Sequence, residues 1–325
     1  MHHAAIIGTG SYTPSNIITN DNLAEFLETN DEWISSRTGI KERRISTGEN
    51  TSDLAYQAAI RALEAAKMDS KNIDLIICAT ITPDSFMPSV ACIIQDKLGA
   101  TNAAAFDLTA ACTGLIYAIV IADQFIRSGM YKNILLVGAE TISKVLDWED
   151  RSTCVLFGDG AGAVLLSATK DENGVLTANL LSDGSKQSFL TCPAIPVFNP
   201  YVGLEREEFK PKIEMQGQEV FKYAVRSVTD NIKTVLNKAG MTSEDIRYII
   251  PHQANRRIIE QAAKLGDISI EKFYINLDHF GNTSAASIGI ALDELMRSNE
   301  LKPGDKLILV GFGGGMTSGA VLIEI

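Results

Sequence analysis

The chain has 325 residues, of which 46% are hydrophobic and 21% are charged, the balance of an ordinary folded protein. A chain of this length can bury a large core and has room for two domains. Its formal net charge of -11 argues against a general nucleic-acid binder, because such a protein needs a basic surface.

The cysteines and the apolar runs indicate in which cellular compartment the protein is expected. There are five cysteines, an odd number, and no two have CxxC spacing. We therefore expect neither a metal site nor a disulfide framework, and a reducing, cytoplasmic setting. No apolar run reaches the ~18 residues of a membrane span, and the sequence enters an apolar stretch near residue 4 without the features of a signal peptide. We expect no membrane insertion.

In the first half of the chain, short apolar runs alternate with longer stretches of helical period. The runs predict strands that are covered on both faces by helices, because they are apolar throughout. In chain order we predict a strand at residues 5–8, a helix at 51–67, a strand at 74–79, a helix at 90–98, a strand at 104–108, a helix at 114–128, and strands at 133–138 and 161–166.

The second half repeats this pattern after a proline-containing connection at 186–211, which we predict to be irregular. We predict a helix at 217–239, a strand at 247–250, a helix at 256–265, a strand at 273–277, a helix at 284–298, and strands at 306–310 and 320–325. The order strand, strand–turn–helix, strand, strand thus occurs twice at unequal intervals. We interpret it as an internal duplication, with halves at 1–170 and 171–325 and one α/β layer in each.

Three polar residues lie at predicted strand ends. Cys112 follows the strand at 104–108 and precedes a helix, and Asn282 follows the strand at 273–277 and precedes a helix. The duplication predicts that these two positions are equivalent. His252 follows the strand at 247–250. Because α/β sheets bind ligands at the carboxyl ends of their strands, these residues are candidates for one site where the halves meet.

Each of the three has a structural and a chemical interpretation. A buried cysteine is most often a small core residue, but one at a helix start has a reason to ionise, since the helix dipole favours thiolate. His252 can be a base, an oxyanion donor or a structural residue. A metal role lacks partners, because only His279 is available outside the N-terminus. Asn282 can cap a helix or donate its amide to an oxyanion.

The glycine-rich loop at 311–315 follows a predicted strand. It matches neither the G-x-G-x-x-G fingerprint nor a P-loop, and it precedes a strand rather than a helix. We interpret it as a tight turn whose backbone approaches a reacting carbonyl closely.

Several motifs together resemble one family, the β-ketoacyl-acyl-carrier-protein synthases III. They are DEWI at 31–34, RTGI at 37–40, ACTG at 111–114, CVLFGDGAG at 154–162, HQAN at 252–255, GNTSAA at 281–286 and FGGG at 312–315. Each motif is weak alone, but their order and number are specific, and they run from near residue 6 to the C-terminus. The resemblance implies a thiolase fold, an α/β class with duplicated halves in a five-layered α/β/α/β/α arrangement, and a homodimer.

The resemblance also implies a reaction and its residues. A short acyl-CoA, most simply acetyl-CoA, acylates Cys112, and malonyl-acyl carrier protein then decarboxylates and condenses with the acyl group to give a 3-oxoacyl carrier protein, which initiates fatty-acid synthesis. His252 and Asn282 donate to the malonyl thioester, and the backbone N–H groups of Cys112 and Gly314 form an oxyanion hole. Coenzyme A is part of a substrate, and no cofactor is implied.

Further roles follow from the same resemblance. Trp33, Arg37 and Arg151 bind the CoA nucleotide. Phe157 and Met87 line the acyl pocket, with Met87 coming from the partner subunit. Relatives often have phenylalanine at the Met87 position, and the flexible methionine suggests room for longer or branched starters.

Carrier protein is acidic, so its docking needs a local basic patch. Gln253, Arg256 and Arg257 are the candidates by resemblance, and a solvated helix face is the simpler interpretation of the two arginines.

Other members of the same superfamily give the main alternatives. A related acyltransferase of secondary metabolism, making a quinolone, a polyketide or an ester, would use the same Cys–His–Asn set. A hydroxymethylglutaryl-CoA synthase would need a glutamate base as well, and the sequence offers no evident match. A non-catalytic acyl-CoA-binding protein would have no need for the nucleophile with both of its partners.

Overall fold

The structure is a computed structural model that describes residues 3–171, 173–197, 199–201 and 211–325. Its first sheet has the strand order β1-β7-β6-β4-β5. β4 is parallel to β5 and β6, and β7 is antiparallel to β6 and β1. The strands are β1 (His3–Tyr12), β4 (Leu75–Ala79), β5 (Ala104–Leu108), β6 (Asn133–Glu140) and β7 (Gly160–Thr169).

The second sheet has the order β11-β12-β13-β8 and repeats the same directions. β11 is parallel to β12, and β13 is antiparallel to both β12 and β8. Its strands are β8 (Gly174–Ser182), β11 (Tyr248–Pro251), β12 (Lys306–Gly313) and β13 (Thr317–Glu324). A single parallel bridge from Ile249 to Phe273 stands where β5 stands in the first sheet, so the duplication predicted from the sequence is present in the topology.

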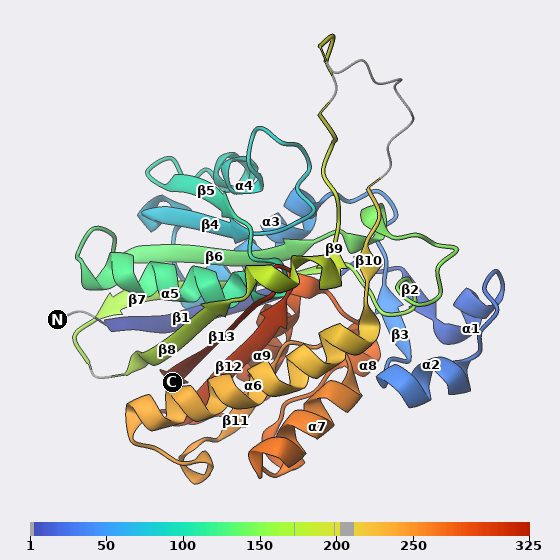
Figure 1. Cartoon of the computed structure of the whole chain (residues 1–325). Coiled ribbons are helices and arrows are strands. Elements are labelled where there is room, and N and C mark those ends of the chain that lie inside the picture. The colour runs from blue at the N-terminus through green and yellow to red at the C-terminus, as the bar shows by residue number, and fades with distance from the viewer. Residues whose placement is uncertain (1–2, 172, 198, 202–210) are drawn as a thin grey trace.

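In the described residues, six longer helices complete five layers. They are α3 (Thr51–Ala66), α4 (Val90–Leu98), α5 (Gly114–Arg127), α6 (Gly217–Ala239), α7 (Arg256–Gly266) and α9 (Ser287–Arg297). α3 and α4 cover the outer face of the first sheet, and α6 and α7 cover the outer face of the second (Figure 1). α5 and α9 share one buried core with the inner faces of both sheets. This is the five-layered α/β/α/β/α thiolase arrangement.

Strand sequences explain why both faces of each sheet are covered. In β6, Leu136 belongs to the core shared with α5, and the next residue, Val137, belongs to the core under α3. In β12, Leu309 and Val310 divide in the same way between the shared core and the core under α6. Successive side chains point to opposite faces, so an unbroken apolar run fits a strand between two helical layers.

Shorter elements lie around this frame. They are β2 (Ile17–Thr19), α1 (Asn20–Ala24), α2 (Asp31–Thr38), β3 (Glu42–Arg44), β9 (Leu190–Thr191), β10 (Glu214–Met215) and α8 (Leu277–Phe280), with 3₁₀ turns η1 (Ser70–Asn72), η2 (Ala111–Thr113), η3 (Ile142–Val145), η4 (Gly184–Phe189), η5 (Ser243–Asp245), η6 (Ile270–Lys272) and η7 (Ser284–Ala286). No helix in the described part of the chain is long and apolar enough to cross a bilayer.

Two sequence predictions are corrected. Residues 273–277 were expected to form a strand, but only Phe273 makes a β-bridge and the chain then turns into α8. The connection at 186–211 is not wholly irregular, because it begins within η4 and contains β9, which pairs with β10. Residues 198 and 202–210 of this predicted connection lie outside the described residues.

The turns before α5 and α9 correct a third prediction. Ala111 and Ser284 both have left-handed backbone conformations, at φ values of 47° and 50°. Each stands three residues before its helix, so Ala111 and Ser284 are the equivalent positions of the two halves. Cys112 therefore corresponds to Ala285, and its predicted equivalence to Asn282 is wrong. Asn282 lies earlier in its turn.

Candidate active site

Cys112 lies in η2, next to the end of β12. A Cβ atom on Gly313 would stand 2.7 Å from the Cys112 backbone nitrogen, so only glycine permits this approach. The Thr113 and Thr317 hydroxyls meet at 2.8 Å, and Thr317 Oγ1 also donates to the Gly314 carbonyl at 3.2 Å. The glycine-rich segment of the second half is thus fixed against the nucleophile of the first.

The Cys112 thiol is buried and neutral. Burial raises its pKa to about 12, a hydrogen bond with Ser284 lowers it, and the charge of Glu140 raises it further. The sequence predicted that the helix start would favour thiolate. That expectation is wrong for the free protein, because α5 begins only at Gly114 and desolvation outweighs the favourable hydrogen bonds.

Glu140 is a fully buried carboxylate that the sequence reasoning missed. At the end of β6 it accepts hydrogen bonds from Thr82 Oγ1 at 2.6 Å and from Ser284 Oγ at 3.1 Å. Burial raises its pKa to about 7, against the lowering effect of these bonds. The sequence does contain a signal for Glu140, an acidic residue at the end of an apolar strand. Cys112 was selected because it also follows a predicted strand.

His252 follows β11 and is held by three contacts. Its backbone N–H donates to Val310 at 2.8 Å, its Nδ1 lies 2.7 Å from Ser287 Oγ, and its ring stands edge-on to Phe312 with 5.3 Å between centroids. Burial lowers its pKa to about 3, so the imidazole is neutral at physiological pH. Nε2 is buried and has no hydrogen-bond partner in the described part of the chain.

Asn282 is held by its backbone and by one side-chain oxygen. Its N–H donates to Leu156 at 2.8 Å, its carbonyl accepts from Gly158 at 3.0 Å, and its Oδ1 accepts the Ser284 N–H at 2.9 Å. Asn282 is not a helix cap, because the cap positions of η7 and α9 are Thr283 and Ala286, and its Oδ1 instead closes a local turn with Ser284. Its Nδ2 group makes no hydrogen bond within the described residues, and its predicted role as an oxyanion donor stays a prediction.

Shared neighbours bring the three residues together. Ser284 contacts both the Cys112 thiol and the Asn282 side chain. The last three residues of β12, Gly311 to Gly313, lie against His252 at one end and against Cys112 at the other. Through these shared neighbours, Cys112 of one half lies in the same region as two neutral hydrogen-bonding side chains of the other, His252 and Asn282.

The predicted nucleotide residues also gather. The guanidinium carbons of Arg37 and Arg151 lie 4.6 Å and 5.1 Å from the centre of the Trp33 ring. Arg151 also donates to the backbone carbonyl of Glu28. An indole flanked by two guanidiniums is a suitable platform for a planar, electron-rich base.

Phe157 and Met87 occupy different environments. Phe157 is buried in an apolar cluster with Ile142, Cys154 and Ile213, against which half-buried Cys192 packs. Met87 is 83% exposed and is not part of this cluster. Within one chain, the structure therefore places only Phe157 in an apolar environment near Asn282, to which it is bridged.

The three predicted docking residues also differ. Gln253 is buried, donates through Nε2 to the Pro251 carbonyl at 2.8 Å and accepts the Asn276 N–H at 3.1 Å. Its predicted contact with a carrier protein is therefore wrong, because its polar groups hold the segment that carries His252. Arg256 and Arg257 are exposed at the start of α7, and Arg256 is paired with Glu260 at 2.9 Å.

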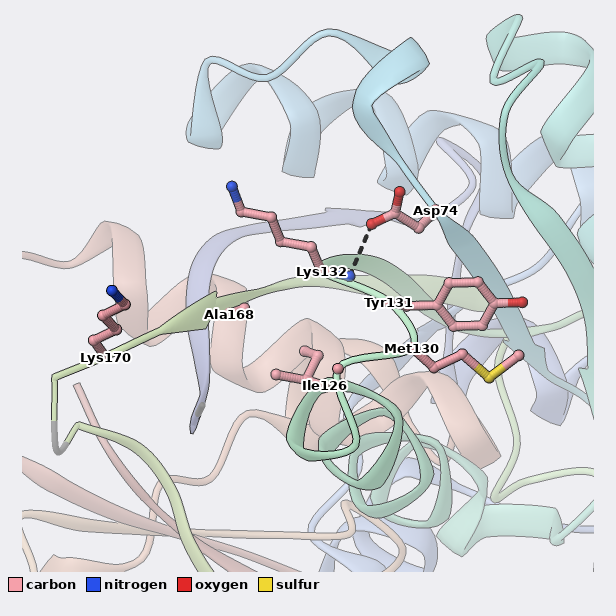
Figure 2. A pocket seen from close by; sticks show the side chains of 8 residues that line it. Asp74, Ile126, Met130, Tyr131, Lys132, Ala168 and Lys170 are labelled. Atoms are coloured by element: carbon pink, nitrogen blue, oxygen red, sulfur yellow. Dashed lines mark hydrogen bonds between the residues drawn. The ribbon is translucent and has the colours of Figure 1, made fainter. Parts of the chain in front are cut away.

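A cavity of about 500 Å³ lies elsewhere in the molecule (Figure 2). Asp74 precedes β4 and Lys132 precedes β6, so the cavity is at the opposite end of the sheet from Cys112. Asp74 accepts the Lys132 backbone N–H at 2.8 Å and thus closes a turn. No predicted site residue lines the cavity; its lining is Asp74, Ile126, Gly129, Met130, Tyr131, Lys132, Ala168 and Lys170.

Comparison with known proteins agrees with this geometry. Residues 106–184 match the family described as 3-oxoacyl-[acyl-carrier-protein] synthase III, and residues 236–325 match its C-terminal family. The beta-ketoacyl-[acyl-carrier-protein] synthase III of Clostridium acetobutylicum is 55% identical, covering 100% of this chain and 99% of the relative.

Solved structures agree as well. The 3-oxoacyl-[acyl-carrier-protein] synthase III of Aquifex aeolicus superposes with a TM-score of 0.92 at 46% identity, covering 99% of this chain and 100% of the other. The priming β-ketosynthase of the R1128 polyketide pathway superposes with a TM-score of 0.91 at 33% identity, covering 99% and 96%.

Fold and site together define a condensing acyltransferase of the thiolase fold. Within that class, the chain belongs to the β-ketoacyl-acyl-carrier-protein synthase III family.

The raised pKa of Cys112 predicts how its alkylation depends on pH. An acid whose pKa is raised stays neutral up to that pKa, so the thiolate fraction, and the rate of alkylation by iodoacetamide, should rise about ten-fold per pH unit without levelling near ~8.5 as an ordinary thiol does. Mass spectrometry of the Cys112 peptide measures the rate.

The same assay tests the influence of Glu140. Glu140→Gln removes a negative charge that raises the Cys112 pKa, so alkylation at pH 8 should become faster. Asp159→Asn, at another buried carboxylate, is the matched control and should leave the rate unchanged. A plateau below pH 9 in the unaltered protein, or equal effects of the two variants, would contradict the account.

Proposed function

We propose that this enzyme condenses a short acyl-CoA with malonyl-acyl carrier protein, with loss of carbon dioxide, to give a 3-oxoacyl carrier protein. The observation that carries the proposal is the meeting of Cys112 with His252 and Asn282 across the two halves. One residue is a nucleophile, and the other two are neutral groups able to donate hydrogen bonds.

In the first half-reaction, the Cys112 sulfur attacks the thioester carbonyl of the acyl-CoA. A carbon–sulfur bond forms to Cys112, the bond to CoA breaks, and the thiol proton ends on the departing CoA sulfur. The backbone N–H groups of Cys112 and Gly314 hold the transient oxyanion. The close approach of Gly313 keeps this loop against η2, which supports the assignment.

In the second half-reaction, the malonyl thioester loses carbon dioxide and its oxygen takes up negative charge. His252 Nε2 and Asn282 Nδ2 donate to that oxygen. The resulting carbanion attacks the acyl carbonyl on Cys112, a carbon–carbon bond forms, the bond from the carbonyl to the Cys112 sulfur breaks, and the sulfur takes a proton from water. Removing one such donor typically costs ~10²–10³ in rate. His252 and Asn282 are both uncharged, so each can donate a hydrogen bond without any change in its protonation state.

Substrate binding follows from the surrounding residues. Trp33, Arg37 and Arg151 form the platform for the CoA adenine, which would insert beside the indole. The apolar cluster around Phe157 receives the acyl chain. The proposed chemistry treats coenzyme A as substrate and assigns no role to a metal or a cofactor.

A homodimer is part of the proposal. β5 is the open edge of the first sheet, and the loop before α4 carries the exposed side chains of Phe86 and Met87, with Phe106 partly exposed on β5 itself. An unpaired strand edge beside exposed apolar side chains is a site for pairing with a second copy. Met87 would then reach the acyl pocket of the partner subunit.

The product is proposed to enter fatty-acid synthesis in the cytoplasm. A polyketide fate would use the same residues, and the R1128 priming enzyme has the same fold. Higher identity to the clostridial and Aquifex enzymes favours the fatty-acid product.

Product formation tests the reaction directly. The enzyme with acetyl-CoA and malonyl-acyl carrier protein should release one carbon dioxide for each 3-oxoacyl carrier protein, and Cys112→Ser should lose the condensation. Mass spectrometry of the carrier protein and trapping of labelled carbon dioxide measure both. Transfer of the acyl group to carrier protein without carbon dioxide release would replace the proposal with a simple transferase.

Charge reversal on α7 tests carrier docking. Arg257 is exposed at the start of the helix, beside the segment that carries His252, so Arg257→Glu should raise the KM for malonyl-acyl carrier protein several-fold and weaken its dependence on salt. Lys264→Glu, two turns further along α7, is the matched control and should have little effect. An unchanged, salt-dependent KM in Arg257→Glu would exclude this docking surface.

A further inference from the structure

The two ring nitrogens of His252 have different surroundings. Nδ1 lies 2.7 Å from Ser287 Oγ, whereas Nε2 is buried without a partner in the described part of the chain. Because the imidazole is neutral, it carries a single ring proton. The nitrogen that bears this proton decides whether Nε2 can donate to a substrate oxygen or only accept.

Ser287 is placed to fix which ring nitrogen of His252 carries the proton. Ser287 is buried at the first residue of α9, and its Oγ accepts the backbone N–H of Gln253 at 3.4 Å. The Gln253 side chain is itself fixed by hydrogen bonds to the Pro251 and Tyr274 carbonyls. The hydroxyl oxygen therefore has a rigid donor on one side and the imidazole on the other.

Counting hydrogens favours one arrangement. Ser287 has one hydroxyl hydrogen, and no acceptor for it other than His252 Nδ1 is found among the described residues. If Nδ1 carried the ring proton, the Ser287 hydrogen and the Nε2 lone pair would both lack partners in a buried site. If Ser287 donates to Nδ1, only the Nε2–H group is left over, and that group is available to a ligand. Buried polar groups are nearly always paired, so the second arrangement is preferred.

We propose that Ser287 is a positioning residue for the condensation: it donates its hydroxyl hydrogen to His252 Nδ1 and so keeps the imidazole in the Nε2–H form that donates to the malonyl thioester oxygen. Ser287 acts through His252 and does not touch substrate. The inference rests on the proposed role of His252. Its consequence is that loss of the hydroxyl should impair decarboxylation and leave the loading of Cys112 intact.

The kinetic test compares three variants in separate half-reactions. Ser287→Ala should lower the turnover of malonyl-acyl carrier protein decarboxylation on the order of 10- to 100-fold, less than the ~10²–10³ of a lost donor, with little change in KM. Transfer of radiolabel from acyl-CoA to Cys112 should stay within about two-fold. Ser287→Thr, which keeps the hydroxyl, should recover most of the loss.

Controls separate the inference from the proposed function. Ser298→Ala removes a hydroxyl at the other end of α9, where it donates to Leu295, and should change neither half-reaction. His252→Ala should lose decarboxylation. If His252→Ala keeps it, the proposed role of His252 fails. If His252→Ala loses decarboxylation and a folded Ser287→Ala does not, only the inference about Ser287 fails.

A spectroscopic test of the His252 tautomer uses the unaltered protein, so it does not depend on the folding of a variant. In the unaltered protein with ¹⁵N-labelled histidine, the His252 ring should show a protonated Nε2 and an unprotonated Nδ1. A proton on Nδ1 would overturn the proposal outright.

Discussion

The site depends on one close approach, that of the end of β12 to the η2 turn of the other half. Gly313 lies so near the Cys112 backbone nitrogen that a side chain there would collide with it. This contact crosses the seam between the two duplicated halves. It exists because α5 and α9 share a single apolar core with both sheets, which fixes the halves relative to one another. The active site therefore lies at the interface between the two halves and is formed by neither half alone.

Burial gives the site its electrostatic character. Desolvation keeps His252 neutral and raises the pKa values of Cys112 and Glu140. The neutral Cys112 and His252 suit a reaction whose negative charge appears only transiently, on a thioester oxygen. Donors that are already oriented in a dry site need no reorganisation when that charge develops. Ser287 and Ser284, which hold His252 and Asn282, supply the orientation.

The strands and helices of the two sheets could be predicted from the sequence because both sheets are covered on both faces. Strands such as β4, β6 and β12 are apolar throughout, and a strand of this kind is visible in the sequence. β8 was missed because it is an edge strand with few fully buried residues. The predicted strand at 273–277 was wrong because a single apolar bridge is enough to place Phe273 in the core.

The three principal residues of the site were identified from strand ends and motifs, but their surroundings were not. The ionisation of Cys112 was misjudged because desolvation depends on packing that no local pattern encodes. Ser287 and Glu140 reach the site through contacts 35 and 144 residues apart in sequence, to His252 and Ser284 respectively. Gln253 belongs to a recognisable motif, yet its side chain turns inward to hold the backbone.

The central claim is that Cys112 carries the acyl group before the second substrate arrives. The most direct measurement is peptide mapping by mass spectrometry after incubation with acyl-CoA alone. The account predicts one acyl group per chain on the Cys112 peptide, with an equal amount of CoA released. An adduct on another cysteine, or no adduct until malonyl-acyl carrier protein is added, would contradict it.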